Sequence, residues 1–337
     1  MSPAEVPIRL AVIGCGFMGT KRIEAIGLLE DARLAATVDP FRAPAETRAP
    51  HYRDLAELIP EAYDAAVVAV PHDAAPGLTD TLLAAGKPVL VEKPLATSAA
   101  VARKLERLAE KVPAPSFVGY NYRFLPTVRK LLSVAADGSL GRLRSIDMTI
   151  GHGGHPGSGK EWKLDPRRAG GGVLLDPGVH LLDLLLQLAP EASCTALEAT
   201  RGFWGGGIEE DVVVVFRANQ LLVSLRVSHI RWINTFRIEL FGEDGYCLAE
   251  GRGGNYGPMI LRLGKRWGWD ADRDLTQRES EAVEDFGTTD LSLRDELAEV
   301  TRSWRTDRLP DHPCHPATFA EARAVVELLD ELYARMS

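Results

Sequence analysis

The chain has 337 residues, which is enough for two domains of ordinary size. Its 45% hydrophobic and 26% charged residues are typical of a globular protein, and the net charge of −8 argues against a general nucleic-acid binder, which needs a basic surface. No apolar run approaches the ~20 residues of a membrane helix, and the segment from Met1 to Leu10 lacks the features of a signal peptide. The four cysteines are scattered without paired spacing, which predicts free thiols in a cytoplasmic protein.

Short apolar segments alternate with helical patterns in the first third of the chain. Strands are predicted at 8–13, 34–38, 65–70, 88–91 and 116–119, and helices at 18–29, 74–85 and 99–111. This alternation predicts a doubly wound parallel sheet of the Rossmann type.

The pattern changes near Phe124, where Pro126 is placed to open a new helix. Alternating or aromatic-rich runs then predict strands at 195–203, 211–216, 221–229, 235–241 and 246–250, followed by helices at 290–304 and 317–336. We therefore predict an α/β protein in which a parallel-sheet domain, 1–124, precedes a domain with a mostly antiparallel sheet, 125–337.

A Gly-x-Gly-x-x-Gly motif follows the first predicted strand. Gly14, Gly16 and Gly19 permit a tight turn, close approach of a pyrophosphate and close helix–strand packing, and the helix N-terminus offers N–H donors to phosphates. Asp39 ends the next apolar segment at the spacing expected of a ribose-binding carboxylate. A plain Gly-rich turn is the alternative. Asp39 should repel a 2′-phosphate and so favours NAD, whereas Arg42 could accommodate NADP.

The tripeptide Glu92-Lys93-Pro94 follows the apolar run that ends at Val91. Ligands of open α/β sheets bind outside the carboxyl ends of the strands, so Lys93 is placed to face a ligand. A surface lysine before a turn fits the tripeptide equally well.

A polar pair opens an otherwise apolar helix later in the chain. Asp176 suits an N-cap and Pro177 the first helical position, and His180 shares a face with Asp183. Asp176 as a simple cap and His180 as a core histidine are the alternatives. The triple glycine at 170–172 favours a functional interpretation, since it implies backbone brought close to another group.

A Gly-rich loop at 151–163 precedes this helix and could cover a substrate. Four basic residues at the end of this loop and just after it could bind a phosphate or carboxylate, or simply be solvated: Lys160, Lys163, Arg167 and Arg168. The two histidines of the Gly-rich loop lack acidic or thiol partners at ligand spacing, so we predict no metal site.

These motifs together resemble the Gfo/Idh/MocA family, the glucose–fructose oxidoreductase and inositol dehydrogenase group. The matching segments occur in the family's order: 14–19, 69–71, 92–94, 119–124 and 170–183. The resemblance implies a Rossmann domain, a C-terminal α/β domain whose large open sheet forms dimer or tetramer contacts, and NAD(P)-linked chemistry on sugars, cyclitols or their derivatives. This chain departs from the family at His72 and Ala75, where asparagine and histidine are frequent.

The resemblance also assigns site residues. The implied catalytic residues are Lys93, Asp176 and His180. The implied cofactor contacts are Gly14, Gly16, Phe17, Met18, Gly19, Asp39, Pro40, Ala69, Val70, Pro71, Glu92, Lys93, Asn121 and Arg123. The implied substrate contacts are Lys93, Tyr122, His152, Lys163, Asp176 and His180.

The leading hypothesis is hydride transfer between a nicotinamide and a ring hydroxyl or ketone, with His180 as the base and Lys93 stabilising the alkoxide. Two alternatives remain: an NAD-dependent glycosidase with transient hydride transfer, and a catalytically silent sugar sensor. The substrate could also be a sugar phosphate or a sugar nucleotide.

Overall fold

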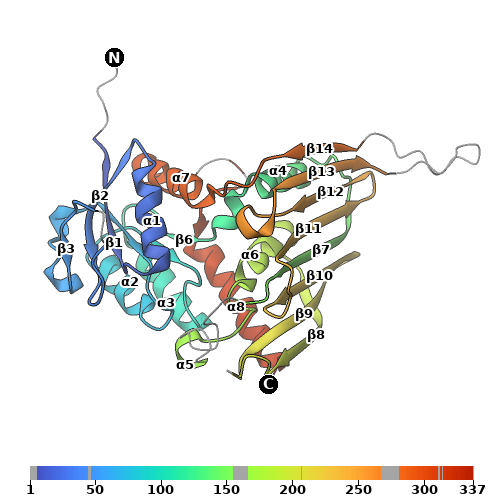
Figure 1. The fold of residues 1–337 in the computed structure, drawn as a ribbon, viewed down its shortest axis with the longest axis horizontal. Coiled ribbons are helices and arrows are strands. Elements are labelled where there is room, and N and C mark those ends of the chain that lie inside the picture. The colour runs from blue at the N-terminus through green and yellow to red at the C-terminus, as the bar shows by residue number, and fades with distance from the viewer. Residues whose placement is uncertain are drawn as a thin grey trace, which may run out of the picture. The chain divides into compact units, whose positions relative to one another are not determined.

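The structure is a computed structural model that describes residues 6–44, 47–154, 166–205, 207–266, 281–309, 312 and 314–336. Contacts between residues divide the chain into two units. The first unit comprises Met1–Asn121, Arg167–Gly170 and Leu291–Asp330, and the second comprises Tyr122–Pro166, Gly171–Asp290 and Glu331–Ser337. Figure 1 labels the elements of both units.

The first unit is built on a seven-stranded sheet with the order β15-β6-β5-β4-β1-β2-β3. The strands are β1 (Ile8–Ile13), β2 (Ala32–Val38), β3 (His51–Tyr52), β4 (Ala65–Val68), β5 (Val89–Glu92), β6 (Phe117–Gly119) and β15 (Ala317–Thr318). All pairs are parallel except β15 with β6. The predicted doubly wound parallel sheet is confirmed.

Strand register explains how distant motifs reach one edge of this sheet. Ile13 pairs with both Val38 and Val68, and Val68 pairs with Val91. The chain therefore leaves four neighbouring strands, β5, β4, β1 and β2, at the same level. The residues that follow each strand share the carboxyl edge where ligands of open sheets bind.

Helices α1 (Phe17–Gly27), α2 (Ala75–Ala84) and α3 (Ala99–Ala109) connect these strands, and α7 (Ser292–Thr306) also belongs to this unit. Leu297, Val300 and Trp304 of α7 pack in one core cluster with Ala25 and Ile26 of α1. The predicted division at residue 124 groups α7 with the second domain, whereas the apolar face of α7 packs in the core of the first unit.

The second unit contains an eight-stranded sheet with the order β14-β13-β12-β11-β7-β10-β9-β8. The strands are β7 (Leu143–Gly151), β8 (Ser193–Arg201), β9 (Glu209–Ala218), β10 (Leu221–Ser228), β11 (Thr235–Gly242), β12 (Gly245–Glu250), β13 (Ile260–Lys265) and β14 (Ala282–Asp285). Only the β10–β7 pair is parallel, so the predicted mostly antiparallel sheet is confirmed. Strands β7, β13 and β14 were not predicted.

Helix α4 (Pro126–Ala136) packs against β12 and β13, and α6 (Gly178–Leu188) packs against β7 (Figure 1). The short α5 (Pro166–Ala169) precedes the triple glycine, and α8 (Phe319–Met336) closes the chain. Within the described segments, no helix combines the length and apolar character that crossing a bilayer requires.

The start of α6 differs from the prediction. Pro177 rather than Asp176 occupies the N-cap position, and no side chain caps the helix. The predicted capping role of Asp176 is therefore wrong. The reason is a separate turn before the helix, in which Asp176 N donates to Gly172 O at 2.9 Å and Gly178 N donates to Val173 O at 2.8 Å.

Candidate active site

The glycine turn after β1 has the geometry that a nucleotide-binding turn requires. Gly14 has φ of +95°, and a Cβ there would lie 2.4 Å from the carbonyl oxygen of Ala69. A Cβ on Gly19 would lie 1.9 Å from Gly14 O, whereas one on Gly16 would meet no atom within 4 Å. Gly14 and Gly19 are therefore needed for the turn itself, and Gly16 leaves open space. Helix α1 has no side-chain cap, so its first N–H groups are available to phosphates.

Asp39 lies directly after β2 and is held by the backbone around it. Its Oδ2 accepts from Cys15 N at 2.8 Å, and its Oδ1 accepts from Phe41 N at 2.8 Å and Arg42 N at 3.0 Å. Partial burial by itself raises the pKa of Asp39, but the three backbone hydrogen bonds outweigh it, and the pKa lies below its usual range. The carboxylate is therefore charged and fixed beside the glycine turn.

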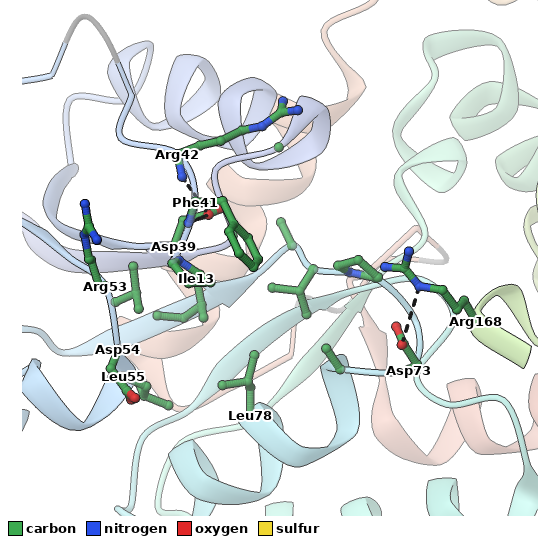
Figure 2. A pocket seen from close by; sticks show the side chains of 18 residues that line it. Ile13, Asp39, Phe41, Arg42, Arg53, Asp54, Leu55, Asp73, Leu78 and Arg168 are labelled. Carbon is green, nitrogen blue, oxygen red and sulfur yellow. Dashed lines mark hydrogen bonds and ion pairs between the residues drawn. The ribbon is translucent and has the colours of Figure 1, made fainter. Parts of the chain in front are cut away.

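A cavity of about 560 Å³ extends along this edge of the first sheet (Figure 2). It is lined by seven of the predicted cofactor residues, Gly14, Gly16, Asp39, Pro40, Ala69, Val70 and Pro71. Leu55 and Leu78 give it an apolar wall, as an adenine ring requires. Its size, its open glycine and its fixed carboxylate fit a dinucleotide.

Other predicted cofactor residues lie outside this cavity lining. Phe17 and Met18 begin α1, where they can offer backbone N–H groups. The Asn121 amide donates to Ser292 Oγ at 2.7 Å. Arg123 is fully buried and binds Asp183 through two hydrogen bonds of 2.8 and 2.6 Å, so its side chain holds α6 rather than facing the cavity.

Glu92 also has a structural partner. Its Oε1 accepts from Nε of the fully buried Arg22 at 2.6 Å, and Glu296 of α7 pairs with Arg22 at 2.7 Å. A Cβ on Gly119 would lie 2.7 Å from an Arg22 nitrogen, so this glycine makes room for the guanidinium. Lys93 follows Glu92 at the carboxyl edge of the sheet and is half-buried.

In the second unit, His180 is buried on α6 and its imidazole is held by aromatic stacking. The ring lies parallel to that of Tyr122, with centroids 3.8 Å apart and an interplanar angle of 10°. Phe236 contacts Tyr122 edge-on at 5.6 Å, and the Arg252 guanidinium lies 4.9 Å from the Tyr122 ring centroid. Burial raises the pKa of the Tyr122 hydroxyl, and Arg252 opposes this only in part, so Tyr122 stays protonated. The imidazole plane is thus fixed by its neighbours.

A buried carboxylate holds the glycine segment that leads to Asp176. Glu209 accepts from Gly172 N at 2.9 Å, Leu174 N at 3.1 Å and the Tyr333 hydroxyl at 2.8 Å. A Cβ on Gly172 would lie 2.1 Å from Glu209 O, and one on Gly171 would lie 2.0 Å from the Tyr333 hydroxyl. This close packing explains Gly171 and Gly172, and Gly170 has a φ of +83°. Together they set the backbone just before Asp176 and His180.

A second cavity, of about 330 Å³ and polar lining, lies in the second unit. Arg252 lies at 4.3 Å from the Tyr256 ring centroid and 3.7 Å from Asp290 Oδ2. The residues that line this cavity are His152, Gly154, Asn234, Arg252, Gly253, Gly254, Asn255, Tyr256 and Asp290. Paired charges, amides and an aromatic ring are groups that can recognise a polyhydroxylated ring.

Among these lining residues, only His152 was predicted from the sequence. Arg252, Tyr256 and Asp290 lie in segments that carry no motif, so no local signal identified them. Glu209 begins a strand and was also missed, although the triple glycine indicated that a close neighbour existed. Lys163 lies outside the described residues. No group of three or more potential metal-ligating side chains occurs in the part of the chain that the structure covers.

Comparison with known proteins identifies the family. A model of the oxidoreductase family with an NAD-binding Rossmann fold, GFO/IDH/MocA, matches residues 8–120, and the model of the GFO/IDH/MocA C-terminal domain matches residues 128–247. The chain belongs to this family. The resemblance drawn from the sequence motifs is thereby confirmed, as is the prediction of an NAD(P)-linked oxidoreductase.

Individual proteins resemble this chain in sequence or in fold. Inositol 2-dehydrogenase of Rhizobium meliloti (strain 1021) is 27% identical over 270 residues, which cover 76% of this chain and 78% of the relative. The fold is shared with KijD10, a 3-ketoreductase from Actinomadura kijaniata in complex with NADP and TDP-benzene (TM-score 0.79, 16% identity, 97% of each chain). It is also shared with the WlbA dehydrogenase from Bordetella pertussis in complex with NADH and UDP-GlcNAcA (TM-score 0.78, 20% identity, 97% of this chain and 96% of that one).

The position of Asp39 predicts how the GFO/IDH/MocA cofactor site of this chain selects its dinucleotide. Asp39→Asn removes the charge that repels a 2′-phosphate, and we expect the ratio of NAD to NADP affinity to fall by about tenfold. Titration of both reduced cofactors by fluorescence checks this. Arg42→Ala is the comparison variant. It should weaken NADP binding, but not NAD binding, if the Arg42 guanidinium binds the 2′-phosphate. An unchanged ratio in Asp39→Asn would contradict the role of the carboxylate.

Proposed function

We propose that this chain is a dehydrogenase or ketoreductase that transfers a hydride between NAD(P) and a ring hydroxyl or ketone of a sugar, cyclitol or sugar derivative. The observation that carries the proposal is the buried imidazole of His180, held by Tyr122 stacking in an otherwise apolar helix. The stacking fixes the plane of the imidazole, and a fixed imidazole suits proton transfer to and from a substrate hydroxyl, the chemistry expected of this family.

In the proposed reaction the bound nicotinamide supplies or accepts the hydride. His180 removes the hydroxyl proton in the direction of oxidation and returns it in reduction, because an imidazole titrates near neutral pH. Lys93 stabilises the developing alkoxide by its charge, and Asp176 orients His180 or binds a neighbouring hydroxyl. These three roles are assigned by the family motifs.

The polar cavity of the second unit is the proposed binding site for the substrate ring. The Arg252–Asp290 pair can share hydrogen bonds with vicinal hydroxyls, and Asn234 and Asn255 add donors and acceptors. Tyr122, predicted as a substrate contact, is proposed instead to position His180, since its ring is buried against the imidazole.

The test is a substrate panel with NAD and NADP, followed by nicotinamide absorbance. It contains inositols, free sugars, sugar phosphates and sugar nucleotides, and the corresponding ketones with reduced cofactor. We expect stoichiometric cofactor reduction with at least one ring alcohol. Sugar release from a glycoside without net cofactor reduction would favour the glycosidase alternative, and cofactor binding without any turnover would favour the sensor.

We further propose that a second copy of the chain packs on the outer face of the eight-stranded sheet. Strand register places Val213, Leu222 and Phe241 on the same face, and they are 36%, 42% and 38% exposed. Exposed apolar side chains on one sheet face are typical of an oligomer contact. Light scattering should give a dimer or tetramer that Leu222→Glu weakens, and a monomeric wild type at micromolar concentration would contradict the proposal.

We also propose that the protein works in the cytoplasm. All four cysteines are free and buried, which fits a reducing compartment. Thiol titration of the denatured protein should find four reactive thiols when it is purified without reductant.

A further inference from the structure

Arg168 reaches the cofactor cavity from a segment far from the Rossmann motifs. It lines the same cavity as Gly14 and Gly16, although it lies about 150 residues later in the sequence, just before the triple glycine. Figure 2 shows its side chain at one end of the cavity, whereas Arg42 and Arg53 lie at the other end, on the side of Asp39. The cavity thus has a cationic group at both ends.

The backbone beside Arg168 is fixed against the loop that follows β4. Ala169 is buried, and its carbonyl oxygen lies 2.9 Å from Nδ1 of His72, in hydrogen-bond contact. The adjacent Asp73 also lines the cavity. The hydrogen bond between His72 and Ala169 therefore fixes the backbone next to Arg168, and this contact depends neither on the charge of Arg168 nor on a ligand.

The ion pair that Arg168 makes is loose. Its Nε lies 3.8 Å from Asp73 Oδ2, and the two side chains are 49% and 45% exposed. Such solvated pairs contribute little free energy, so the guanidinium is free to bind a stronger anion. Asp73 alone would repel a diphosphate, and among the described lining residues Arg168 is the cation beside it (Figure 2).

We propose that Arg168 is a cofactor-binding residue whose guanidinium pairs with the diphosphate of NAD(P) and offsets the repulsion from Asp73. The proposal rests on the proposed NAD(P)-dependent function. A guanidinium binds phosphate oxygens through paired, charge-assisted hydrogen bonds, and it complements the backbone N–H donors of the glycine turn. Arg168 lies two residues before the triple glycine, so it is close in sequence to the segment that leads to Asp176.

The experiment measures binding rather than turnover. Wild type, Arg168→Ala and Arg168→Lys are titrated with NADH by fluorescence, and ADP-ribose and adenosine are titrated by displacement of NADH. We expect Arg168→Ala to raise Kd for NADH and ADP-ribose about tenfold, to leave that for adenosine unchanged, and to reduce the salt dependence of binding. Arg168→Lys should restore most of the affinity, and Asp73→Asn should increase it.

Arg33→Ala is the matched control, because Arg33 is an exposed arginine near the opposite, amino end of β2. It should leave all three ligands unaffected. Unchanged ADP-ribose binding in Arg168→Ala, or an equal loss for adenosine and ADP-ribose, would overturn the proposal. Because the readout is cofactor affinity, it stands or fails separately from the substrate panel that tests the proposed reaction.

Discussion

We expect His180→Ala to lower kcat by about 10²- to 10⁴-fold, the usual contribution of a positioned general acid or base. In the proposed mechanism the same imidazole takes and returns the proton, so the loss is expected in both reaction directions. We expect Lys93→Ala to lower kcat by a comparable factor, since the role proposed for its charge is to stabilise the alkoxide. Steady-state rates on the best substrate of the panel measure both effects, and NADH titration checks that the cofactor still binds.

The matched control for His180 is Gln187→Ala, which changes another polar side chain of the same helix. Gln187 lies near the C-terminal end of α6 and is half-buried, so its loss should change kcat by less than about threefold if helix packing alone is involved.

Tyr122→Leu keeps the apolar packing but removes the ring that stacks on the imidazole. It should lower kcat more than it raises KM. Near-normal turnover in both His180→Ala and Lys93→Ala would contradict the assignment of these two residues as catalytic.

Arg22→Met destabilises the first unit by about 3–5 kcal/mol, the cost of breaking a buried ion pair. The guanidinium is fully buried, lies 2.6 Å from Glu92 and 2.7 Å from Glu296, and ties helix α1 to β5 and α7. Burial by itself lowers the pKa of Arg22, but the two carboxylates outweigh it and raise the pKa, so the charge persists. Without the arginine, Glu92 and the buried Glu296 lose the cation that they share. The midpoint of thermal or urea unfolding measures the change.

Arg9→Met provides the matched control for Arg22. Arg9 pairs with Asp64 at 2.7 Å in the same unit, but both side chains are over a third exposed, so water replaces the lost partner and we expect a far smaller change. The triple variant Arg22→Met, Glu92→Gln, Glu296→Gln should recover part of the loss, because no unpaired charge remains buried. If Arg22→Met unfolds at the same midpoint as Arg9→Met, the buried cluster does not stabilise the unit as argued.

Local patterns predicted the parts of the fold in which a short segment decides its own structure. The apolar strands, the glycine turn and Asp39 were all visible, since each depends on spacing within a few dozen residues. Strand β7 was missed, although its alternating burial from Ile146 onward is the pattern typical of a strand with one buried face. Strand β14 was missed because all its residues are exposed, so it has no apolar signature.

The candidate site divides in the same way. Lys93, Asp176 and His180 were predicted because they occur in motifs, and the capping role of Asp176 was wrong because a preceding turn displaced the helix start. Glu209 and Arg252 were not predicted, because each acts on residues far away in sequence. A carboxylate that holds a glycine segment looks, in the sequence, like any residue at the start of a strand.

The sequence by itself determined the class of this protein: a glycine turn, a carboxylate at the spacing expected for ribose binding, and a lysine and histidine in family motifs, each recognisable from local spacing. Only the tertiary structure decided the surroundings of these groups. It placed α7 on the first unit, Arg22 between two carboxylates, Tyr122 on the imidazole and Arg168 in the cofactor cavity. The physical reason is that burial and pairing depend on which distant surfaces meet, and no local pattern encodes the identity of a distant partner.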